Sequence, residues 1–142
     1  MILVDVNLLL YAHNPRAVDH AAARAWFEST LGGSALVRFA WMTLWAFVRI
    51  TTNSRAFERP TSTAQAAERV ASWLARPACG MLDPGERHWD ILTDLLRSGQ
   101  VSGPLVTDAV LAAIAIEHGA VLYTTDRDFA RFPGLRFVNP LQ

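Results

Sequence analysis

The chain has 142 residues, of which 13 are basic, all arginine, and 13 are acidic, so its formal net charge is zero. An apolar fraction of 51% and a charged fraction of 18% exclude a mainly disordered chain and indicate a compact globule, most simply one domain over residues 1–142. Zero net charge also excludes bulk electrostatic attraction to nucleic acid. The arginines suit local phosphate contacts, although a coding bias toward Arg is the simpler explanation.

No stretch of the sequence predicts a membrane span or an export signal. No apolar run reaches the roughly 18 residues that a span requires, and Met1 leads directly into an apolar segment without a charged region ahead of it. The single Cys79 cannot form an internal disulfide, which suits a reducing compartment. We therefore expect a cytoplasmic protein with no membrane association.

The first half of the chain predicts strands and helices in alternation. Apolar residues 2–4 form a short strand, residues 7–12 and 19–27 form helices, and residues 35–39 form a second strand. In the segment Trp41–Ile50, the residues Trp41, Leu44, Trp45 and Val48 recur at helical spacing, which predicts that they form a buried face. The polar segment of residues 51–63 is predicted to be an exposed loop.

The second half continues the alternation. A helix is expected over residues 64–75, a short strand over 79–82, and a helix opened by the cap-like Asp83-Pro84-Gly85-Glu86 and running toward Leu96. A helix over residues 105–116 is apolar on nearly every side, which predicts packing on more than one face. Residues 120–123 and 135–138 are the last strands, with a helical turn at 126–132 between them. Such alternation implies a parallel sheet.

Three segments bring carboxylates to one edge of this sheet. Asp5 follows the first strand, Asp126 and Asp128 follow the strand over residues 120–123, and Asp108 lies near the start of the helix that leads into that strand. If the two strands are parallel neighbours, all of these acids reach the edge formed by the carboxyl ends of the strands, where α/β proteins bind ligands. Each acid alone is equally well explained as a helix cap or as a partner of a helix dipole.

Crowded carboxylates repel one another and must take up protons or bind a cation. Mg²⁺ or Mn²⁺ is the natural cation, because both prefer oxygen ligands and no His or Cys accompanies the acids at a zinc-like spacing. Such a site suits hydrolysis of phosphodiesters by an activated water. The four histidines show no catalytic or metal-binding spacing. Arg49 suits either an RNA phosphate or an ion pair with one of the acids.

At these motifs the chain resembles the PIN-domain family, and within it the VapC-type toxin ribonucleases of bacterial toxin–antitoxin pairs. The resemblance rests on the order and spacing of three segments, Asp5-Val6-Asn7-Leu8-Leu9, Thr107-Asp108-Ala109 with Ala112-Ala113, and Thr125-Asp126-Arg127-Asp128-Phe129. Two further segments are similar to a branch of these toxins, around Phe47, Arg49 and Asn53 and over Phe132-Pro133-Gly134-Leu135.

This resemblance implies a three-layer α/β/α sandwich with a central parallel sheet of four to five strands and a Mg²⁺- or Mn²⁺-dependent endoribonuclease activity. It also implies a homodimer and a cognate VapB-type antitoxin whose tail occupies the acidic groove. Asp5, Asp108 and Asp126 would be catalytic metal ligands, Asp128 a further ligand and Asn7 a supporting polar residue. Arg49, Arg55 and Arg59 would guide the RNA backbone.

One position departs from the family pattern. Members commonly have a Glu on the third main helix, where this chain has Ala46. Asp128 would then supply the missing oxygen, or one metal ion would suffice, or activity would be weak; Glu86 and Glu117 lie outside the motifs. A PIN domain that only binds RNA or protein is therefore the alternative function, followed by a metal-dependent DNA nuclease or phosphatase.

Overall fold

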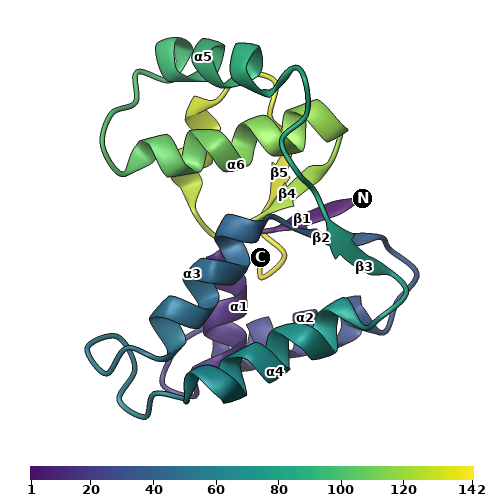
Figure 1. Cartoon of the computed structure of the whole chain (residues 1–142), viewed down its shortest axis with the longest axis vertical. Helices are drawn as coiled ribbons and strands as arrows, with labels where there is room; N and C mark the ends of the chain where they lie inside the picture. The colour runs from purple at the N-terminus through teal and green to yellow at the C-terminus, as the bar shows by residue number, and fades with distance from the viewer.

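A computed structural model describes all residues 1–142 and contains a five-stranded parallel sheet between two layers of helices (Figure 1). The strand order is β3-β2-β1-β4-β5, with β1 (Ile2–Val4) at the centre. Its neighbours are β2 (Val37–Phe39) and β4 (Val121–Tyr123), and the edges are β3 (Cys79–Met81) and β5 (Phe137–Val138). The predicted sandwich and parallel sheet are confirmed.

The two faces of the sheet carry different helices. One layer holds α1 (Val6–His13), α2 (His20–Leu31), α3 (Trp41–Thr51) and α4 (Thr63–Leu74). The other holds α5 (His88–Ser98) and α6 (Leu105–His118), and the short 3₁₀ helix η1 (Arg127–Arg131) lies between β4 and β5 (Figure 1). No helix combines the length and apolar character needed to cross a membrane.

Alternation along β1 divides the core between the two layers. Ile2 and Val4 belong to the cluster under α1–α4, whereas Leu3 belongs to the cluster under α5 and α6. Successive strand residues point to opposite faces, so three consecutive apolar residues serve both cores. As predicted, α6 is packed on more than one side, because six of its residues are buried: Ala109, Leu111, Ala112, Ala113, Ile114 and Ala115.

Two local predictions are wrong. The buried face of α3 consists of Thr43, Leu44, Phe47 and Thr51, whereas Trp41 and Trp45 are 44% and 67% exposed. The helix is so apolar that periodicity alone does not identify which side meets the core. The segment after β3 also does not open a helix at Asp83, and α5 begins only at His88.

Glu117 explains the late start of α5. Its carboxylate accepts hydrogen bonds from the backbone N–H groups of Gly85 and Arg87, at 2.7 and 3.0 Å. His118, with Nε2 2.7 Å from the Asp83 carbonyl oxygen, ties the same segment to the end of α6. These tertiary contacts hold residues 83–87 outside the helix and override the local capping pattern.

Candidate active site at the carboxyl edge of the sheet

The carboxyl ends of β1 and β4 meet, as the sequence predicts. The two strands pair in parallel with Val4 opposite Tyr123, so the next residues on each strand, Asp5 and Thr124, are adjacent. The hydroxyl of Thr124 donates a 2.7 Å hydrogen bond to Oδ2 of Asp5 across 119 residues of sequence. Asp5 is thereby attached to the β4 side of the site.

Asp5 serves as a helix cap and as a site carboxylate at once. Its Oδ1 accepts a 2.8 Å hydrogen bond from the Val6 N–H at the start of α1. Its side chain is buried, and burial raises the pKa of this carboxyl above its ordinary value, with the nearby charge of Asp126 adding to the effect. The hydrogen bonds from Thr124 and Val6 act in the opposite direction and favour the ionised form.

Asp126 and Asp128 enter the site from the turn after β4. Asp126 caps η1, and its Oδ1 accepts the Asp128 N–H at 2.8 Å. The Asp126 N–H in turn donates to the Thr124 hydroxyl at 3.0 Å. Thr124 is therefore the junction between Asp5 and Asp126, and it is fully buried. Thr124 was not predicted as a site residue, although its position directly after the strand, two residues before an acid, was the available signal.

Asp108 reaches the same place from the first turn of α6. Burial, followed by the charges of Asp126, Asp5 and Asp128, raises its pKa to about 6, and only Arg131 acts in the opposite direction. Like charges raise a carboxyl pKa only when they lie nearby in a poorly screened environment. The structure therefore brings together all four acids that were predicted from the sequence.

The charges of Asp5, Asp126 and Asp128 all act on Asp108, but no three His, Cys, Asp or Glu side chains are already placed to hold one ion. Asp5 is fixed by two hydrogen bonds and Asp126 by one, from the Asp128 N–H, whereas the carboxylates of the partly buried Asp108 and the exposed Asp128 accept none. Several carboxylate oxygens with one opposing arginine form a donor set that fits Mg²⁺ or Mn²⁺.

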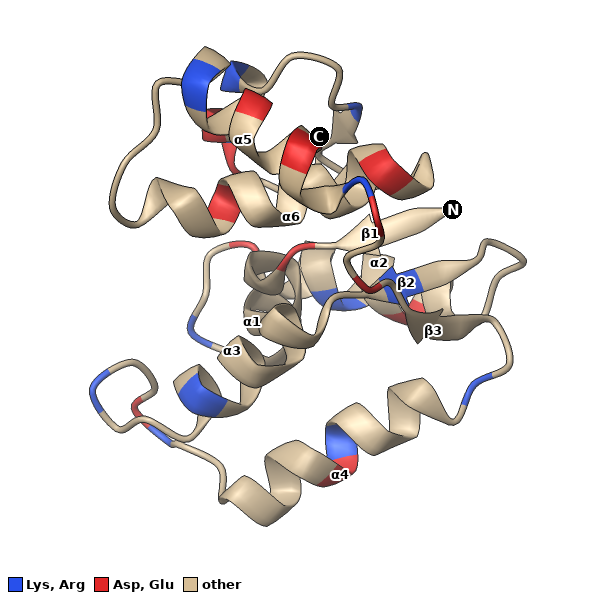
Figure 2. Ribbon diagram, turned by 45° about the horizontal axis from the view of Figure 1, so that its top comes forward, with Lys and Arg blue, Asp and Glu red and all other residues tan.

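Three other residues considered for the site, Asn7, Ala46 and Glu117, contribute no ligand to the acid cluster in the structure. Asn7 is half-buried in the first turn of α1 and makes no side-chain hydrogen bond. Ala46 is in the middle of α3 and supplies no oxygen ligand. Glu117 is at the far end of α6 from Asp108, and Figure 2 shows an acidic segment near each end of this helix. Glu117 is therefore no substitute for the missing Glu.

The predicted RNA-guiding arginines lie on and after α3. Arg49 is exposed in the last turn of α3, Arg55 is exposed in the following segment, and Arg59 lines a hollow of about 430 Å³. None of them pairs with an acid, because the ion pairs of the structure are Arg16–Glu58, Arg24–Glu28 and Arg97–Asp94. The proposed pairing of Arg49 with the acid cluster is thus not present.

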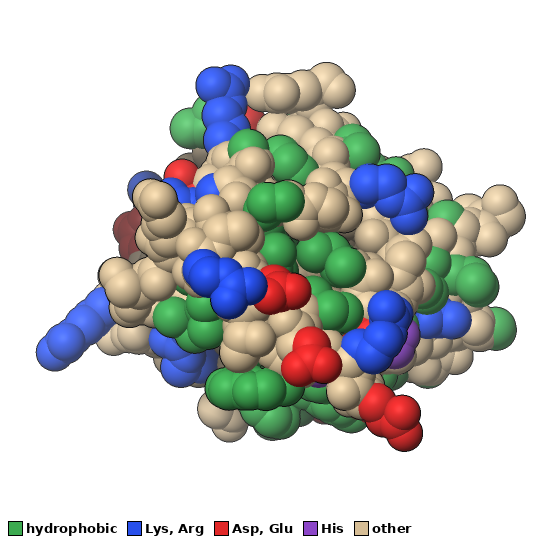
Figure 3. Space-filling model, turned by 90° about the horizontal axis from the view of Figure 1, so that it is seen from above, with side chains coloured by type: hydrophobic (Ala, Val, Ile, Leu, Met, Phe, Trp, Pro, Cys, Tyr) green, Lys and Arg blue, Asp and Glu red, His purple; other side chains and the backbone are tan.

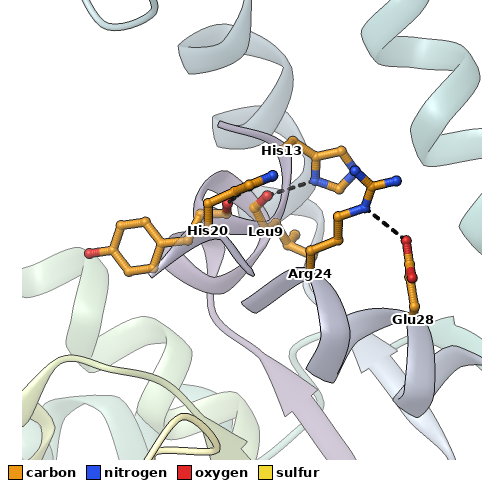
Figure 4. Close-up of polar contacts among 6 residues, drawn as sticks. Leu9, His13, His20, Arg24 and Glu28 are labelled. Carbon is orange, nitrogen blue, oxygen red and sulfur yellow. Dashed lines mark hydrogen bonds and ion pairs between the residues drawn. The ribbon is translucent and has the colours of Figure 1, made fainter. Parts of the chain in front are cut away.

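The histidines do not join the acid cluster. The Nδ1 atoms of His13 and His20 lie 2.7 and 2.8 Å from the carbonyl oxygens of Leu9 and Tyr11 in α1 (Figure 4). His13 also packs edge-on against Phe27 and Phe47, and burial lowers its pKa. These contacts agree with packing roles.

Seen from the side of α5, acidic and basic side chains are interspersed among hydrophobic ones rather than separated by sign (Figure 3).

Comparisons with known proteins agree with this fold. The family model described as "PIN domain" matches residues 2–135. Ribonuclease VapC37 of Mycobacterium tuberculosis is 42% identical over 99% of this chain and 97% of its own length. Among solved structures, FitAcB from Neisseria gonorrhoeae has a TM-score of 0.70 at 20% identity and covers 99% of this chain and 98% of its own.

A toxin–antitoxin complex from Klebsiella pneumoniae gives a TM-score of 0.64 at 18% identity, with 99% of this chain and 98% of the other covered. At these identities the structural matches establish the fold, whereas the family model and the relative at 42% identity cover almost the whole sequence. The chain belongs to the PIN-domain family, in which its sequence is similar to the VapC ribonucleases.

Proposed function

We propose that the protein is a metal-dependent endoribonuclease that acts as the toxin of a toxin–antitoxin pair. The observation that carries the proposal is the convergence of Asp5, Asp108, Asp126 and Asp128 at the carboxyl edge of a parallel sheet. The relative at 42% identity is named a ribonuclease, which supports RNA as the substrate. A complex of toxin and antitoxin shares the fold, which supports an antitoxin as partner. A homodimer remains part of the proposal.

The residues of the site divide into a fixed part and an adjustable part. Asp5 is buried and oriented by Thr124 and the start of α1, so its carboxylate is the anchor for a cation. Asp108, Asp126 and Asp128 are accessible and complete the oxygen set, with Asp128 standing in for the Glu that Ala46 replaces. A bound Mg²⁺ or Mn²⁺ would supply Lewis-acid stabilisation of the phosphodiester and a lowered pKa of water.

The decisive experiment measures cleavage and cation binding together. Purified protein is incubated with structured RNA and Mn²⁺, and ion binding is followed by calorimetry. Asp126→Asn and Asp128→Ala should each lower the cleavage rate at least about tenfold and weaken ion binding, because each removes one oxygen ligand. Asp90→Asn is the matched control, since Asp90 is an exposed acid on α5 that makes no side-chain contact with the cluster. Equal cleavage by the parent and Asp126→Asn would refute the proposal.

A second function, binding without catalysis, is favoured by one specific observation. Ala46 leaves the cluster with one carboxylate fewer than the family pattern, and no preformed three-ligand group is present. If this function is correct, the parent binds RNA but leaves it intact in Mg²⁺ and Mn²⁺. Ala46→Glu should then introduce cleavage, which distinguishes a weakened nuclease site from a different use of the fold.

A further inference from the structure

Helix α3 has an exposed face with an unusual composition. Trp41 and Trp45 are 44% and 67% exposed, although the same protein buries Trp73 to 4% exposure. Arg49 follows at the same interval of four residues and is also exposed. Residues four apart lie above one another on a helix, so the three side chains form one stripe of two aromatic groups and one cation. Exposed aromatic groups of this size call for a functional explanation.

The stripe starts beside the acid cluster. Leu3 of β1 is paired with Arg38 of β2, so continuing the register places Asp5 level with Ala40, the residue before Trp41. Paired strands are about 4.8 Å apart, which puts the start of α3 next to Asp5. Trp45 and Arg49 lie one and two turns further along the helix, about 6 and 12 Å from Trp41 along its axis. In Figure 1, α3 leads away from the sheet edge toward the loop that follows it.

The unpaired charges along this path are positive. No acidic residue occurs in α3, and Arg49, Arg55 and Arg59 form no ion pair. Glu58, the only acid of the segment after α3, is paired with Arg16. Single-stranded nucleic acids are bound by this combination of aromatic faces for the bases and cations for the phosphates.

We propose that Trp41, Trp45 and Arg49 form a track for single-stranded RNA, in which two bases stack on the tryptophans and a phosphate contacts Arg49. The inference rests on the proposed nuclease function and names how its substrate is positioned: bound on the track, an RNA strand presents its next phosphodiester to the acids beyond Trp41. A second copy of this stripe is a poorer occupant, because α3 contains no acidic residue and so offers no anionic group to Arg49, whereas RNA offers a phosphate.

The test measures binding of a labelled single-stranded RNA oligonucleotide by fluorescence anisotropy in EDTA, so that no metal-dependent cleavage occurs. Trp45→Ala and Trp41→Ala should each weaken binding about 5- to 100-fold, the range of one lost base–aromatic stack. Trp45→Phe should restore most of the affinity, because it keeps an aromatic face. Trp89→Ala is the matched control: Trp89 is 68% exposed but lies on α5, and its variant should bind within about twofold of the parent.

Two outcomes would overturn the track. One is unchanged RNA affinity in Trp45→Ala and Trp41→Ala. The other is sedimentation data in which these variants turn a dimer into monomers that bind RNA as tightly as the parent, which would assign the stripe to self-association. Failure of the nuclease function is separate, because a protein that does not cleave RNA but loses binding in Trp45→Ala keeps the track. If the parent cleaves RNA and the tryptophan variants cleave and bind it as the parent does, the track is refuted and the nuclease function stands.

Discussion

At the scale of single residues, the site depends on a hydroxyl that carries no charge. Thr124 donates to Asp5 and accepts from the Asp126 N–H, so one buried oxygen sets the relative position of two acids. The hydrogen bond from Thr124 also lowers the pKa of Asp5 against the effect of burial. A neutral side chain thereby favours the charged form of the anchor carboxylate.

Replacing Thr124 by Val keeps the volume and removes both hydrogen bonds. We expect a loss of about 1–3 kcal/mol in the free energy of unfolding, because a buried carboxylate and a backbone N–H lose their partner. Ion affinity and RNA cleavage should fall with it. Thr51→Val is the control, since Thr51 is equally buried and bonds only to the Phe47 carbonyl in α3. Denaturant unfolding and calorimetry check both variants; a loss of ion binding in Thr51→Val as well would contradict a specific role of Thr124.

Asp108 gives the site a defined dependence on pH. Its pKa of about 6 in the folded protein exceeds the ordinary value of 3.8, so the folded state holds the proton more tightly. The contribution of the protonated Asp108 to the free energy of unfolding is therefore fully present below about pH 4 and is lost as the pH rises through about 6. In EDTA, the free energy of unfolding of Asp108→Asn should therefore exceed that of the parent by about 1 kcal/mol near pH 7.5, after allowance for solvent screening. Near pH 4 the two free energies should be equal.

Unfolding by denaturant at the two pH values measures this difference. The parent serves as reference at each pH, so that other titrating groups cancel. An advantage of Asp108→Asn that is the same at both values would show that the carboxylate is not strained by its neighbours.

At the scale of helices and strands, the order of elements and the meeting of β1 with β4 followed from hydrophobic patterns and the handedness of parallel connections. The patterns placed Asp5, Asp108 and Asp126 at one edge because strand direction fixes where each acid emerges. They could not orient α3, in which apolar residues surround the helix, nor anticipate that Glu117 would hold Gly85 and Arg87 outside α5. Both errors arise from contacts between elements that are distant in sequence.

The end of α6 allows a test of a local rule, namely that a helix end in the left-handed backbone conformation favours glycine. Gly119 has φ +66 and directly follows the helix, and its N–H contacts the carbonyl oxygens of Ala115 and Ile116. Gly119→Ala should cost about 1 kcal/mol of unfolding free energy from the left-handed backbone alone, because a Cβ there meets no atom within 4 Å. Gly119→Asn should cost less.

Gly32 is the matched control, because it follows α2 in the same way but has φ −87 and room for a Cβ. Gly32→Ala should leave the thermal midpoint unchanged or raise it. Equal destabilisation by the alanine variants at both positions would mean that the sign of φ is not the cause.

At the scale of the whole molecule, zero net charge limits long-range attraction to RNA, and binding must come from local contacts. With Arg49, Arg55 and Arg59 as the phosphate contacts, the affinity for single-stranded RNA should fall with a log–log salt slope of about −2. That slope corresponds to a loss of about twentyfold between roughly 50 and 200 mM salt.

Anisotropy titrations at several salt concentrations measure the slope. Arg49→Ala should reduce the magnitude of the salt slope by about 0.7. Trp45→Ala should weaken RNA binding but leave the salt slope unchanged, because stacking releases no counterions. A slope of about −5 or steeper in the parent would reveal a larger basic surface than these three arginines.

The bond between Thr124 and Asp5 also has a consequence for how the protein is made. It joins residues 119 positions apart, and β1 acquires its β4 neighbour only when Val121–Tyr123 are available. A ribosome-bound chain that has emerged only through α6 contains Asp5 and Asp108 but not the strand and turn that bring Asp126 beside them. Since chains emerge from their N-terminus at about 5–20 residues per second, the acids assemble only after the turn that carries Asp126 and Asp128 has emerged. The cell that translates this protein is exposed to a complete site only from that point on.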